Sequence, residues 1–349
     1  MNPRRPPRPG QSAAGETPSD IVAALVRLGL AGPKDAPRFQ RLAGGVSSDI
    51  WRVDLARGTV CVKRALPKLR VAADWRVPVE RNLYEARWIE RAGRIAPDAV
   101  PRLKGQDREA GALVMDFLPP ERYPAWKDQL RTGVADADTA TRVAARLAKI
   151  HAATAGDPAV AAAFPTDRIF HDIRLEPYLL ATARAHTDRS DELVRLARTT
   201  AETKLCLVHG DVSPKNILVG PSGPVFIDAE CAWYGDPAFD LAFCLNHLLL
   251  KCLWVRTATA AFLDCYEVLA GTYLSAVGWE PTEVLERRTA RLLPGLLLAR
   301  VDGKSPVEYL VSPHDKDLAR RWARALLRNP RETLNELRMG WAEELHVER

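Results

Sequence analysis

The stretch Leu207-Val-His-Gly-Asp-Val-Ser-Pro-Lys-Asn-Ile-Leu-Val219 decides the fold that this sequence predicts. Apolar residues enter and leave it as short strands, and between them Asp211 is followed, after four residues, by Asn216. A tight Gly-Pro-Ser-Gly turn comes next. A second apolar strand is then predicted to return antiparallel to the first, which brings Asp228 at its end close to Asn216.

The spacing of Asp211 and Asn216 is typical of the catalytic loop of a kinase. In such a loop the aspartate orients the attacking hydroxyl and accepts its proton, while the asparagine reaches a metal ion. Asp228 and Glu230 occupy alternate positions of an extended segment, so both carboxylates can face one way and hold Mg²⁺ with phosphate oxygens. Asp211 is therefore the predicted base, and Asn216, Asp228 and Glu230 are the predicted metal ligands. A Glu230 side chain that points into solvent is the alternative.

A glycine-rich segment between two predicted strands is a candidate phosphate-binding loop, because its backbone can approach phosphates closely. The residues predicted to contact the nucleotide there are Gly44, Gly45, Ser47 and Ser48. On the next strand Lys63 interrupts an apolar run, so its ammonium group needs a partner if it points inward. Glu85 on a predicted helix is the first choice for this partner and Glu80 the second, and Lys63 would then hold the α- and β-phosphates of ATP. A solvated edge-strand lysine is the alternative.

Residues at the end of the last strand of the first part are predicted to connect it to the second and to flank the adenine, with packing in the core as an equal alternative for the methionine among them. They are Met115, Asp116 and Leu118. Adenine is usually bound there by backbone groups, so the side chains do not distinguish ATP from GTP.

Other residues near the catalytic loop are predicted to support it or to line the substrate site. His209 is expected to hold the loop through hydrogen bonds, and Asp240 to brace it or to begin a helix. Trp233 is the first of several tryptophans that could line a substrate pocket, with packing in the interior as the alternative.

The pattern of elements predicts an α+β protein in two lobes. Residues 1–19 are rich in proline and arginine and are expected to form a disordered tail. Residues 20–118 are expected to form a β-rich, nucleotide-binding lobe with an antiparallel sheet and one main helix. Residues 119–349 are expected to form a mostly helical lobe with the catalytic loop, metal site and substrate pocket, so that the nucleotide cleft lies between the lobes.

The composition is that of a soluble cytoplasmic protein. The 349 residues carry a net charge of +6, which suits anionic ligands such as nucleotides but does not indicate nucleic acid binding. No apolar run reaches the roughly 18 residues of a membrane helix. The six cysteines form no Cys-x-x-Cys pair, which indicates reduced thiols. A monomer and a homodimer are both compatible with these features.

The residues from about 39 to 327 resemble the aminoglycoside phosphotransferase/choline kinase family, and within it the methylthioribose kinases most closely. The resemblance rests on His209-Gly-Asp211 with Asn216, on Asp228-x-Glu230 in place of Asp-Phe-Gly, and on the aromatic segment that ends at Asp240. It implies a protein-kinase-like fold and an ATP- and Mg²⁺-dependent transfer of the γ-phosphate to a hydroxyl. It also implies the roles given above for the base, the metal ligands and Lys63.

The sequence departs from the methylthioribose kinases where, as aligned, they carry paired arginines for the sugar. That pair is absent here, although Arg300 and Lys304 lie nearby in a polar segment and are candidate substrate contacts. The predicted acceptor is therefore a methylthioribose-like sugar or an amino alcohol, with an aminoglycoside antibiotic as the alternative. A non-catalytic, nucleotide-binding pseudokinase is the alternative from another class.

Overall fold

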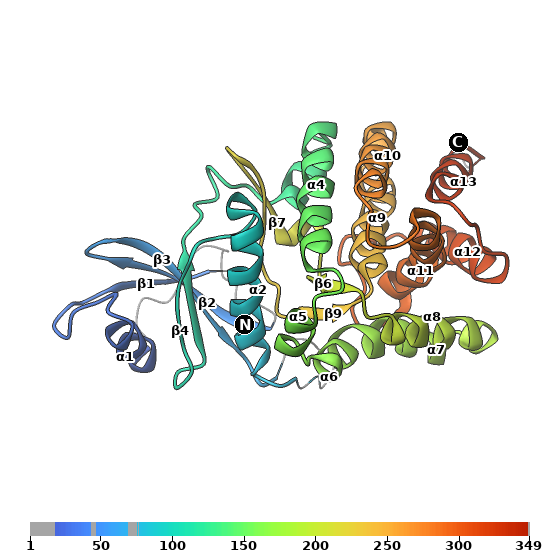
Figure 1. The fold of residues 1–349 in the computed structure, drawn as a ribbon. Helices are drawn as coiled ribbons and strands as arrows, with labels where there is room; N and C mark the ends of the chain where they lie inside the picture. Colours follow the sequence, from blue (N-terminus) through green and yellow to red (C-terminus); the bar gives the residue numbers. More distant parts are fainter. Residues whose placement is uncertain (1–17, 43–46, 69–74, 76, 348–349) are drawn as a thin grey trace, which may run out of the picture. The chain divides into compact units, whose positions relative to one another are not determined.

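The described residues of the computed structural model, 18–42, 47–68, 75 and 77–347, form two compact units whose elements are labelled in Figure 1. Unit 1 consists of Met1–Leu83 and Leu103–Phe117, and unit 2 consists of Tyr84–Arg102 and Leu118–Arg349. Unit 1 contains a sheet and unit 2 is mostly helical. The predicted α+β class is thus confirmed.

Unit 1 is built on a five-stranded antiparallel sheet with the strand order β1-β2-β3-β5-β4. Its strands are β1 (Arg38–Arg41), β2 (Ser48–Leu55), β3 (Gly58–Ala65), β4 (Leu103–Asp107) and β5 (Ala112–Asp116). Valines and other apolar residues recur along the central strands, and one face of the sheet packs against helix α1 (Ser19–Arg27). Ile21 and Leu25 from α1 meet Val53, Val62 and Val114 in this core. Each such buried side chain contributes about 1.5–3 kcal/mol of hydrophobic free energy.

Unit 2 contains most of the helices of the chain. They are α2 (Arg81–Ile95), which begins at the end of unit 1, η1 (Pro97–Ala99), α3 (Trp126–Arg131), α4 (Ala137–Thr154), α5 (Pro158–Ala163), α6 (Asp167–Phe170), η2 (His171–Leu180), α7 (Ala181–Ala185), η3 (Thr187–Arg189), α8 (Ser190–Glu202), η4 (Pro214–Asn216), α9 (Pro237–Trp254), η5 (Arg256–Ala258), α10 (Thr259–Ser275), α11 (Thr282–Asp302), α12 (Pro313–Arg328) and α13 (Leu334–Val347). The segment η2 is a π-helix that contains Pro177 and continues α6 into α7. A π-helical segment turns its side chains out of the ordinary helical register.

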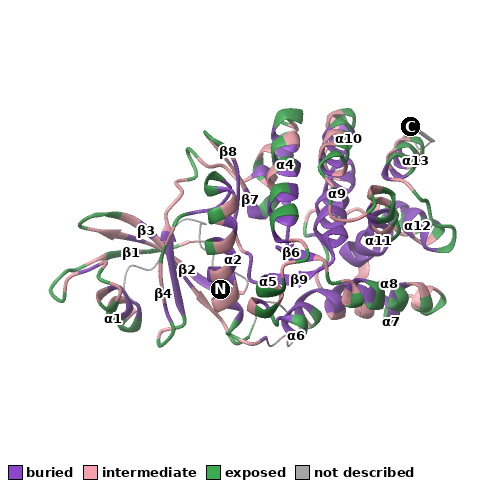
Figure 2. Ribbon diagram, viewed as in Figure 1, coloured by how far each residue is buried: buried purple, intermediate pink, exposed green. Residues whose placement is uncertain are grey.

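Helix α9 is the centre of unit 2. Every residue from Pro237 to Leu253 is buried, and the helix is drawn almost entirely in the colour for buried residues in Figure 2. It packs against α10 and α11. Its start is set by Asp236, whose side chain accepts a hydrogen bond from the backbone N–H of Ala238, and by proline at the first helical position. Its mostly apolar sequence fits a position that is buried on all sides.

Two short antiparallel strand pairs in unit 2 hold the segments that carry the candidate site. Strand β6 (Cys206–Val208) pairs with β9 (Trp233–Gly235), and β7 (Ile217–Gly220) pairs with β8 (Gly223–Phe226). The first pair fixes the chain immediately before and after the catalytic segment. The second is the predicted hairpin, with Ile217 opposite Phe226.

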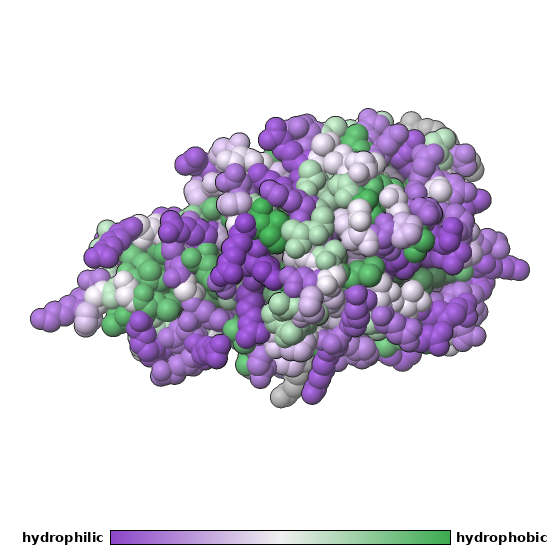
Figure 3. Space-filling view, in the orientation of Figure 1, coloured by the Kyte–Doolittle hydropathy of each residue, from purple (hydrophilic) through white to green (hydrophobic). Residues whose placement is uncertain are grey.

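Hydrophilic residues predominate on the face drawn in Figure 3, and hydrophobic residues form scattered groups on it. Most large apolar side chains lie in the interior. Within the part of the chain that the structure describes, no helix combines the length and the hydrophobicity that a membrane span requires. Five of the six cysteines are buried, and Cys61 is half-buried.

Candidate active site

The predicted base, Asp211, lies buried beside an arginine that sequence reasoning did not single out. The guanidinium Nη2 of Arg174 is 2.8 Å from Oδ2 of Asp211, and both side chains are less than one tenth exposed. Arg174 also donates hydrogen bonds to the backbone carbonyls of Gly210 and Ile173. It comes from the π-helical segment η2, and its contacts tie that segment to the loop that carries Asp211.

The charges around Asp211 keep its carboxylate ionised. Burial alone would raise the pKa of Asp211, but the positive charges of Arg174 and Lys215 outweigh it, and the pKa is lowered from its ordinary value. The Nζ atom of Lys215 is 3.4 Å from Oδ2 of Asp211, and the lysine side chain is about half exposed. A carboxylate held in this way accepts hydrogen bonds at neutral pH and donates none.

The hairpin brings Asn216 and Asp228 together as the sequence spacing predicts. The backbone N–H of Ile227 donates to the carbonyl of Asn216 at 3.0 Å, which places the residue after Ile227 at the end of this pairing. The side-chain Nδ2 of Asn216 donates to the carbonyl of Asp211 at 3.2 Å. Asp228 has φ of 66°, the single positive φ at a non-glycine residue in the described ranges. Such a conformation is rare for residues with a side chain and is concentrated at functional sites.

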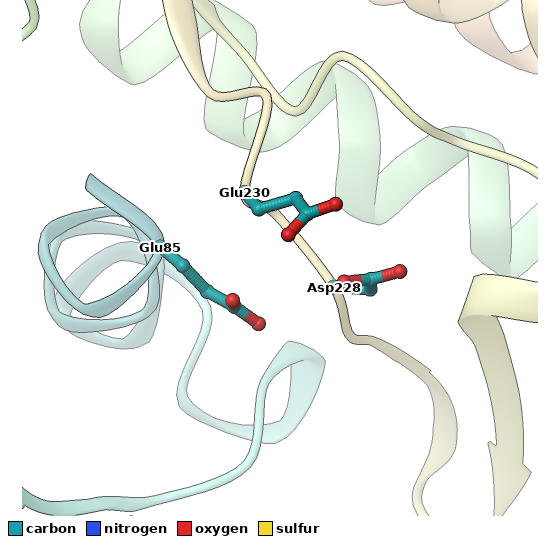
Figure 4. A group of neighbouring side chains, drawn as sticks. All are labelled: Glu85, Asp228 and Glu230. Atoms are coloured by element: carbon teal, nitrogen blue, oxygen red, sulfur yellow. The ribbon is translucent and has the colours of Figure 1, made fainter. Parts of the chain in front are cut away.

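Three carboxylates converge at the end of this hairpin. Oxygen atoms of Glu85, Asp228 and Glu230 lie within 4.8 Å of one another. Figure 4 shows Glu85 reaching from helix α2 toward the extended segment that carries the other two. Carboxylate oxygens are the ligands that Mg²⁺ prefers, and a divalent cation would offset the repulsion among three close negative charges. The donor set therefore fits a magnesium ion, and the cluster includes a residue that the sequence had suggested for the lysine–acid pair.

The backbone of the catalytic loop is held by Asp240. Its two carboxylate oxygens accept hydrogen bonds from the backbone N–H groups of His209 at 2.7 Å and of Gly210 at 2.8 Å. Gly210 has φ of 80°, and a Cβ atom added to it would lie 2.5 Å from the carbonyl oxygen of Cys231. This position therefore requires glycine both for its conformation and for the close approach of the neighbouring chain.

His209 links the loop to the hairpin. Its Nδ1 atom accepts from the backbone N–H of Asp211 at 3.1 Å, and its Nε2 atom lies 3.1 Å from the carbonyl of Ile227. One acceptor and one donor on the same ring require a neutral imidazole. Burial lowers the pKa of His209, which favours this neutral form. The ring also makes an edge contact with Trp88, 4.8 Å between centroids.

The residues predicted to contact the nucleotide lie mostly in unit 1. Ser48 is buried and begins β2, and Ser47 immediately precedes it. Lys63 is buried on β3, opposite Ile50 of β2. Met115 is buried on β5, and Asp116 forms an ion pair with Lys104 at 2.7 Å. Leu118 is the first residue of the second segment of unit 2. Gly44 and Gly45 lie outside the described residues. The nucleotide-contacting roles stay predictions.

The three residues suggested for substrate contact have different surroundings. Trp233 is buried on β9, where its ring stacks on Phe170 at 4.1 Å between centroids. Lys304 forms an ion pair with Glu176 at 3.1 Å, and its side chain is partly exposed. Arg300 is buried on α11 and lines a recess together with residues of the catalytic loop. Of the three, Arg300 is thus the one that the structure brings beside the loop.

Comparison with known proteins places this arrangement among phosphotransferases. A sequence model described as "Phosphotransferase enzyme family" matches residues 38–271. Methylthioribose kinase 1 from Oryza sativa subsp. japonica is 26% identical over 256 residues, which cover 65% of this chain and 59% of the rice protein. The probable ketoamine kinase YniA from Escherichia coli (strain K12) is 27% identical over 225 residues, covering 55% of this chain and 76% of that protein.

A solved structure has the same fold at low sequence identity. A choline/ethanolamine kinase family protein from Mesorhizobium loti matches with a TM-score of 0.53 and 17% identity, covering 92% of this chain and 99% of that one. The fold is therefore kinase-like. The chain spans about 59% of the length of the rice relative.

Proposed function

The chain belongs to the phosphotransferase enzyme family, as its motifs predict, and we propose that it is a kinase that transfers the γ-phosphate of ATP to a hydroxyl of a small metabolite. The observation that carries this proposal is the grouping of an ionised Asp211 with Asn216 and the carboxylate cluster around one hairpin. These are the groups that phosphoryl transfer to a hydroxyl requires.

In the proposed reaction Asp211 accepts a hydrogen bond from the acceptor hydroxyl and orients its oxygen toward the γ-phosphorus. The bond from that oxygen to phosphorus forms while the bond from phosphorus to the leaving ADP oxygen breaks, and the hydroxyl proton passes to Asp211. Transition states of this type are loose, so positioning and charge stabilisation contribute most of the rate. In a loose transition state the acceptor oxygen needs little proton removal before it attacks the phosphorus. A carboxylate base with a low pKa is therefore sufficient.

The remaining groups have supporting roles in this proposal. Asn216, Asp228 and Glu230 would hold Mg²⁺, with Glu85 beside them, and the bound ion would neutralise charge on the phosphate oxygens. Arg174 keeps the base ionised and fixes its position. Lys63 on β3 would hold the α- and β-phosphates. Two relatives are named as a methylthioribose kinase and a probable ketoamine kinase, and these names support a small metabolite as the acceptor.

Release of ADP from Mg·ATP by the full chain, measured in a coupled assay over a panel of hydroxyl compounds, tests this function. Asp211→Asn keeps the size of the side chain but cannot accept the proton. We expect it to lower kcat by about 10² to 10⁴-fold, with nucleotide affinity nearly unchanged. Equal turnover in the variant would contradict the assigned base. Nucleotide binding without turnover on any acceptor would favour a pseudokinase.

A further inference from the structure

A small recess opens beside the catalytic loop within unit 2. It is formed by the loop itself, by α3, α9 and α11, and by the segment that follows α11. Its volume is about 30 Å³, and a cavity of roughly 10–15 Å³ already holds one water molecule. It therefore admits one small functional group and not a whole metabolite. Its lining residues are Lys127, Ser213, Pro214, Lys215, His247, Lys251, Arg300, Glu308 and Tyr309.

Positive charge dominates this recess. Three lysines and an arginine line it, against one carboxylate, Glu308, which is already ion-paired with Lys127. His247, also at the recess, is buried, and burial together with the nearby positive charges lowers its pKa, so the ring is neutral at pH 7. The acid present therefore does not balance the charges of Lys251 and Arg300.

Lys251 is the most unusual of these residues, because it is 1% exposed in the last turn of the buried helix α9. Its Nζ lies 4.0 Å from the ring centroid of Trp254 and 3.8 Å from that of Tyr309. Among the described residues it forms no ion pair or hydrogen bond with a carboxylate. Aromatic faces compensate a buried ammonium in part. A buried cation that lacks a carboxylate partner is costly for the fold, and such groups are concentrated at ligand sites.

Two further polar atoms at the recess are buried and have no hydrogen-bond partner within the described part of the chain. They are Nε of Arg300 and the hydroxyl of Tyr309. Arg300 uses its Nη1 atom to donate to Tyr178 and Ser305, and this fixes the guanidinium. Buried polar groups in native structures nearly always have partners. An oxyanion in the recess would supply acceptors for these donors and for Lys251.

The recess is connected to the predicted base by direct contacts. Lys215 lines the recess, and its Nζ is 3.4 Å from Oδ2 of Asp211. The ring of Tyr178 lies 5.6 Å from the guanidinium carbons of both Arg174 and Arg300, so one aromatic ring contacts the arginine of the base and the arginine of the recess. An acceptor with its hydroxyl on Asp211 can therefore reach the recess with a second group.

We propose that this recess is a subsite for an anionic group, a carboxylate or a phosphate, carried by the acceptor, with Lys251 and Arg300 as its main binding residues. The inference rests on the proposed kinase function, because it names the class of acceptor: a hydroxy acid or the phosphate ester of a polyol. Cationic acceptors such as amino alcohols without an acidic group, and aminoglycosides, are disfavoured by the same charges.

A binding experiment tests the subsite without requiring turnover. Inorganic phosphate and acetate are titrated into the full chain by calorimetry at constant ionic strength set with chloride. We compare the wild type with Lys251→Met, which keeps an unbranched side chain of similar length, and with Lys149→Met, which removes an exposed lysine of α4. A charged hydrogen-bond donor contributes enough to predict at least about tenfold weaker anion binding in Lys251→Met. Lys149→Met should bind as the wild type does.

Identical anion affinity in the wild type and in Lys251→Met would overturn the subsite, as would the absence of anion binding by the wild type. If Lys251→Met does not give the circular dichroism spectrum of the folded protein, the same titration is carried out with Arg300→Gln instead. This second variant is expected to weaken anion binding by a similar factor, and unchanged affinity in it counts equally against the proposal.

Pairs of acceptors that differ in an acidic group then distinguish a failure of the anion subsite from a failure of the proposed kinase function. The ADP-release assay compares glycerol with glycerate, ethanolamine with serine, and ribose with ribose 5-phosphate. Faster release with the anionic member of a pair, and loss of this preference in Lys251→Met, support the subsite and show whether it selects carboxylate or phosphate. Asp211-dependent release that favours neutral or cationic members rejects the subsite but keeps the kinase. A wild type that neither turns over nor binds Mg·ATP rejects the kinase itself.

Discussion

Oδ2 of Asp211 lies 2.8 Å from the guanidinium of Arg174, in a part of unit 2 where both side chains are buried. This contact ties the candidate base to a π-helical segment distant from it in sequence. The ionisation and orientation of the base therefore depend on a residue outside the catalytic loop, and several properties of the protein can be predicted from this arrangement.

Replacing Arg174 by methionine is expected to change both stability and the pH profile. The variant leaves the Asp211 carboxylate buried with less compensation, which costs about 3–5 kcal/mol of unfolding free energy. Because the positive charge of Arg174 lowers the pKa of Asp211, its removal should raise that pKa and move the acidic limb of the kcat/KM profile to higher pH. Chemical denaturation and a pH–rate profile measure the two effects. Arg174→Lys retains a charge and should show a smaller shift, so an equal shift in both variants would argue against the electrostatic cause.

The ion pair also predicts how stability changes in acid. The folded-state pKa of Asp211 lies below its ordinary value of 3.8. Its stabilising contribution is therefore complete above that value and is lost as the pH falls through the lower, folded-state pKa. Denaturation curves of the wild type and of Asp211→Asn should converge over this acidic range. A constant difference between them down to the lowest pH would contradict the prediction.

Substitution of Gly210 by alanine is expected to disrupt the catalytic loop. A left-handed backbone costs about 1–2 kcal/mol for a residue with a side chain, and the added Cβ would also meet the carbonyl of Cys231. The midpoint temperature of thermal denaturation and the rate of turnover should both fall. Gly271→Ala is a matched control, since no heavy atom lies within 4 Å of its added Cβ and it lies in helix α10. That change should stabilise the protein by about 0.5–1 kcal/mol.

Removing the carboxylate of Asp240 should also destabilise the catalytic loop, because the loop backbone loses hydrogen-bond acceptors. In Asp240→Ala the backbone N–H groups of His209 and Gly210 lose their acceptors, and each buried unsatisfied donor costs about 1–3 kcal/mol. We expect a lower kcat with Mg·ATP affinity largely kept, because the residue contacts the loop and not the proposed metal ligands. A change confined to the KM for ATP would show that its role is different.

The carboxylate cluster predicts a dependence on the concentration of Mg²⁺. Glu85→Gln removes one charge from the group formed with Asp228 and Glu230, so about tenfold more Mg²⁺ should be needed for half-maximal turnover. Magnesium titrations at saturating ATP measure this. Glu90→Gln changes an exposed glutamate of the same helix that pairs with Arg94, and it should leave the titration unchanged. Superimposable curves for the wild type and Glu85→Gln would place Glu85 outside the metal site.

The anion subsite predicts that binding weakens as the pH rises. Burial, assisted by the charges of Lys127 and Arg300, lowers the pKa of Lys251 to about 7. An anion binds the protonated lysine, so the affinity for sulfate, which does not titrate in this range, should fall from pH 6 to pH 9. In Lys251→Met the affinity should be lower and nearly constant, and a parallel decline in that variant would assign the effect to another group. The titratable and charged groups around Lys251 are Lys127, Asp128, Lys215, His247, Arg300, Glu308 and Tyr309.

Much of the site follows from local patterns in the sequence. The antiparallel hairpin and its turn are set by apolar strands separated by Gly-Pro-Ser-Gly, so the proximity of Asn216 and Asp228 is a short-range consequence. The antiparallel sheet likewise follows from strand and turn signals, and the structure confirms it. Asp240 was expected either at a helix start or on the loop, and it occupies the first turn of α9 while its carboxylate binds the loop backbone.

Long-range contacts are the part that the sequence could not supply. Arg174 lies in a π-helical segment, where a period of 3.6 residues assigns side chains to the wrong face, so its approach to Asp211 was not predictable. Lys251 left a stronger signal, because it is the single basic charge of a helix whose other residues are mostly apolar. The sequence pattern alone does not distinguish such a lysine from one that reaches solvent at the helix end.

Helix α9 carries the loop brace Asp240 in its first turn and Lys251 in its last, roughly 16 Å apart at a rise of about 1.5 Å per residue. The same helix thus supports the candidate catalytic loop from its first turn and, in the proposed subsite, contributes an anion-binding residue from its last. Substitutions in the last turn are therefore expected to change acceptor preference while the loop contacts of Asp240 are kept.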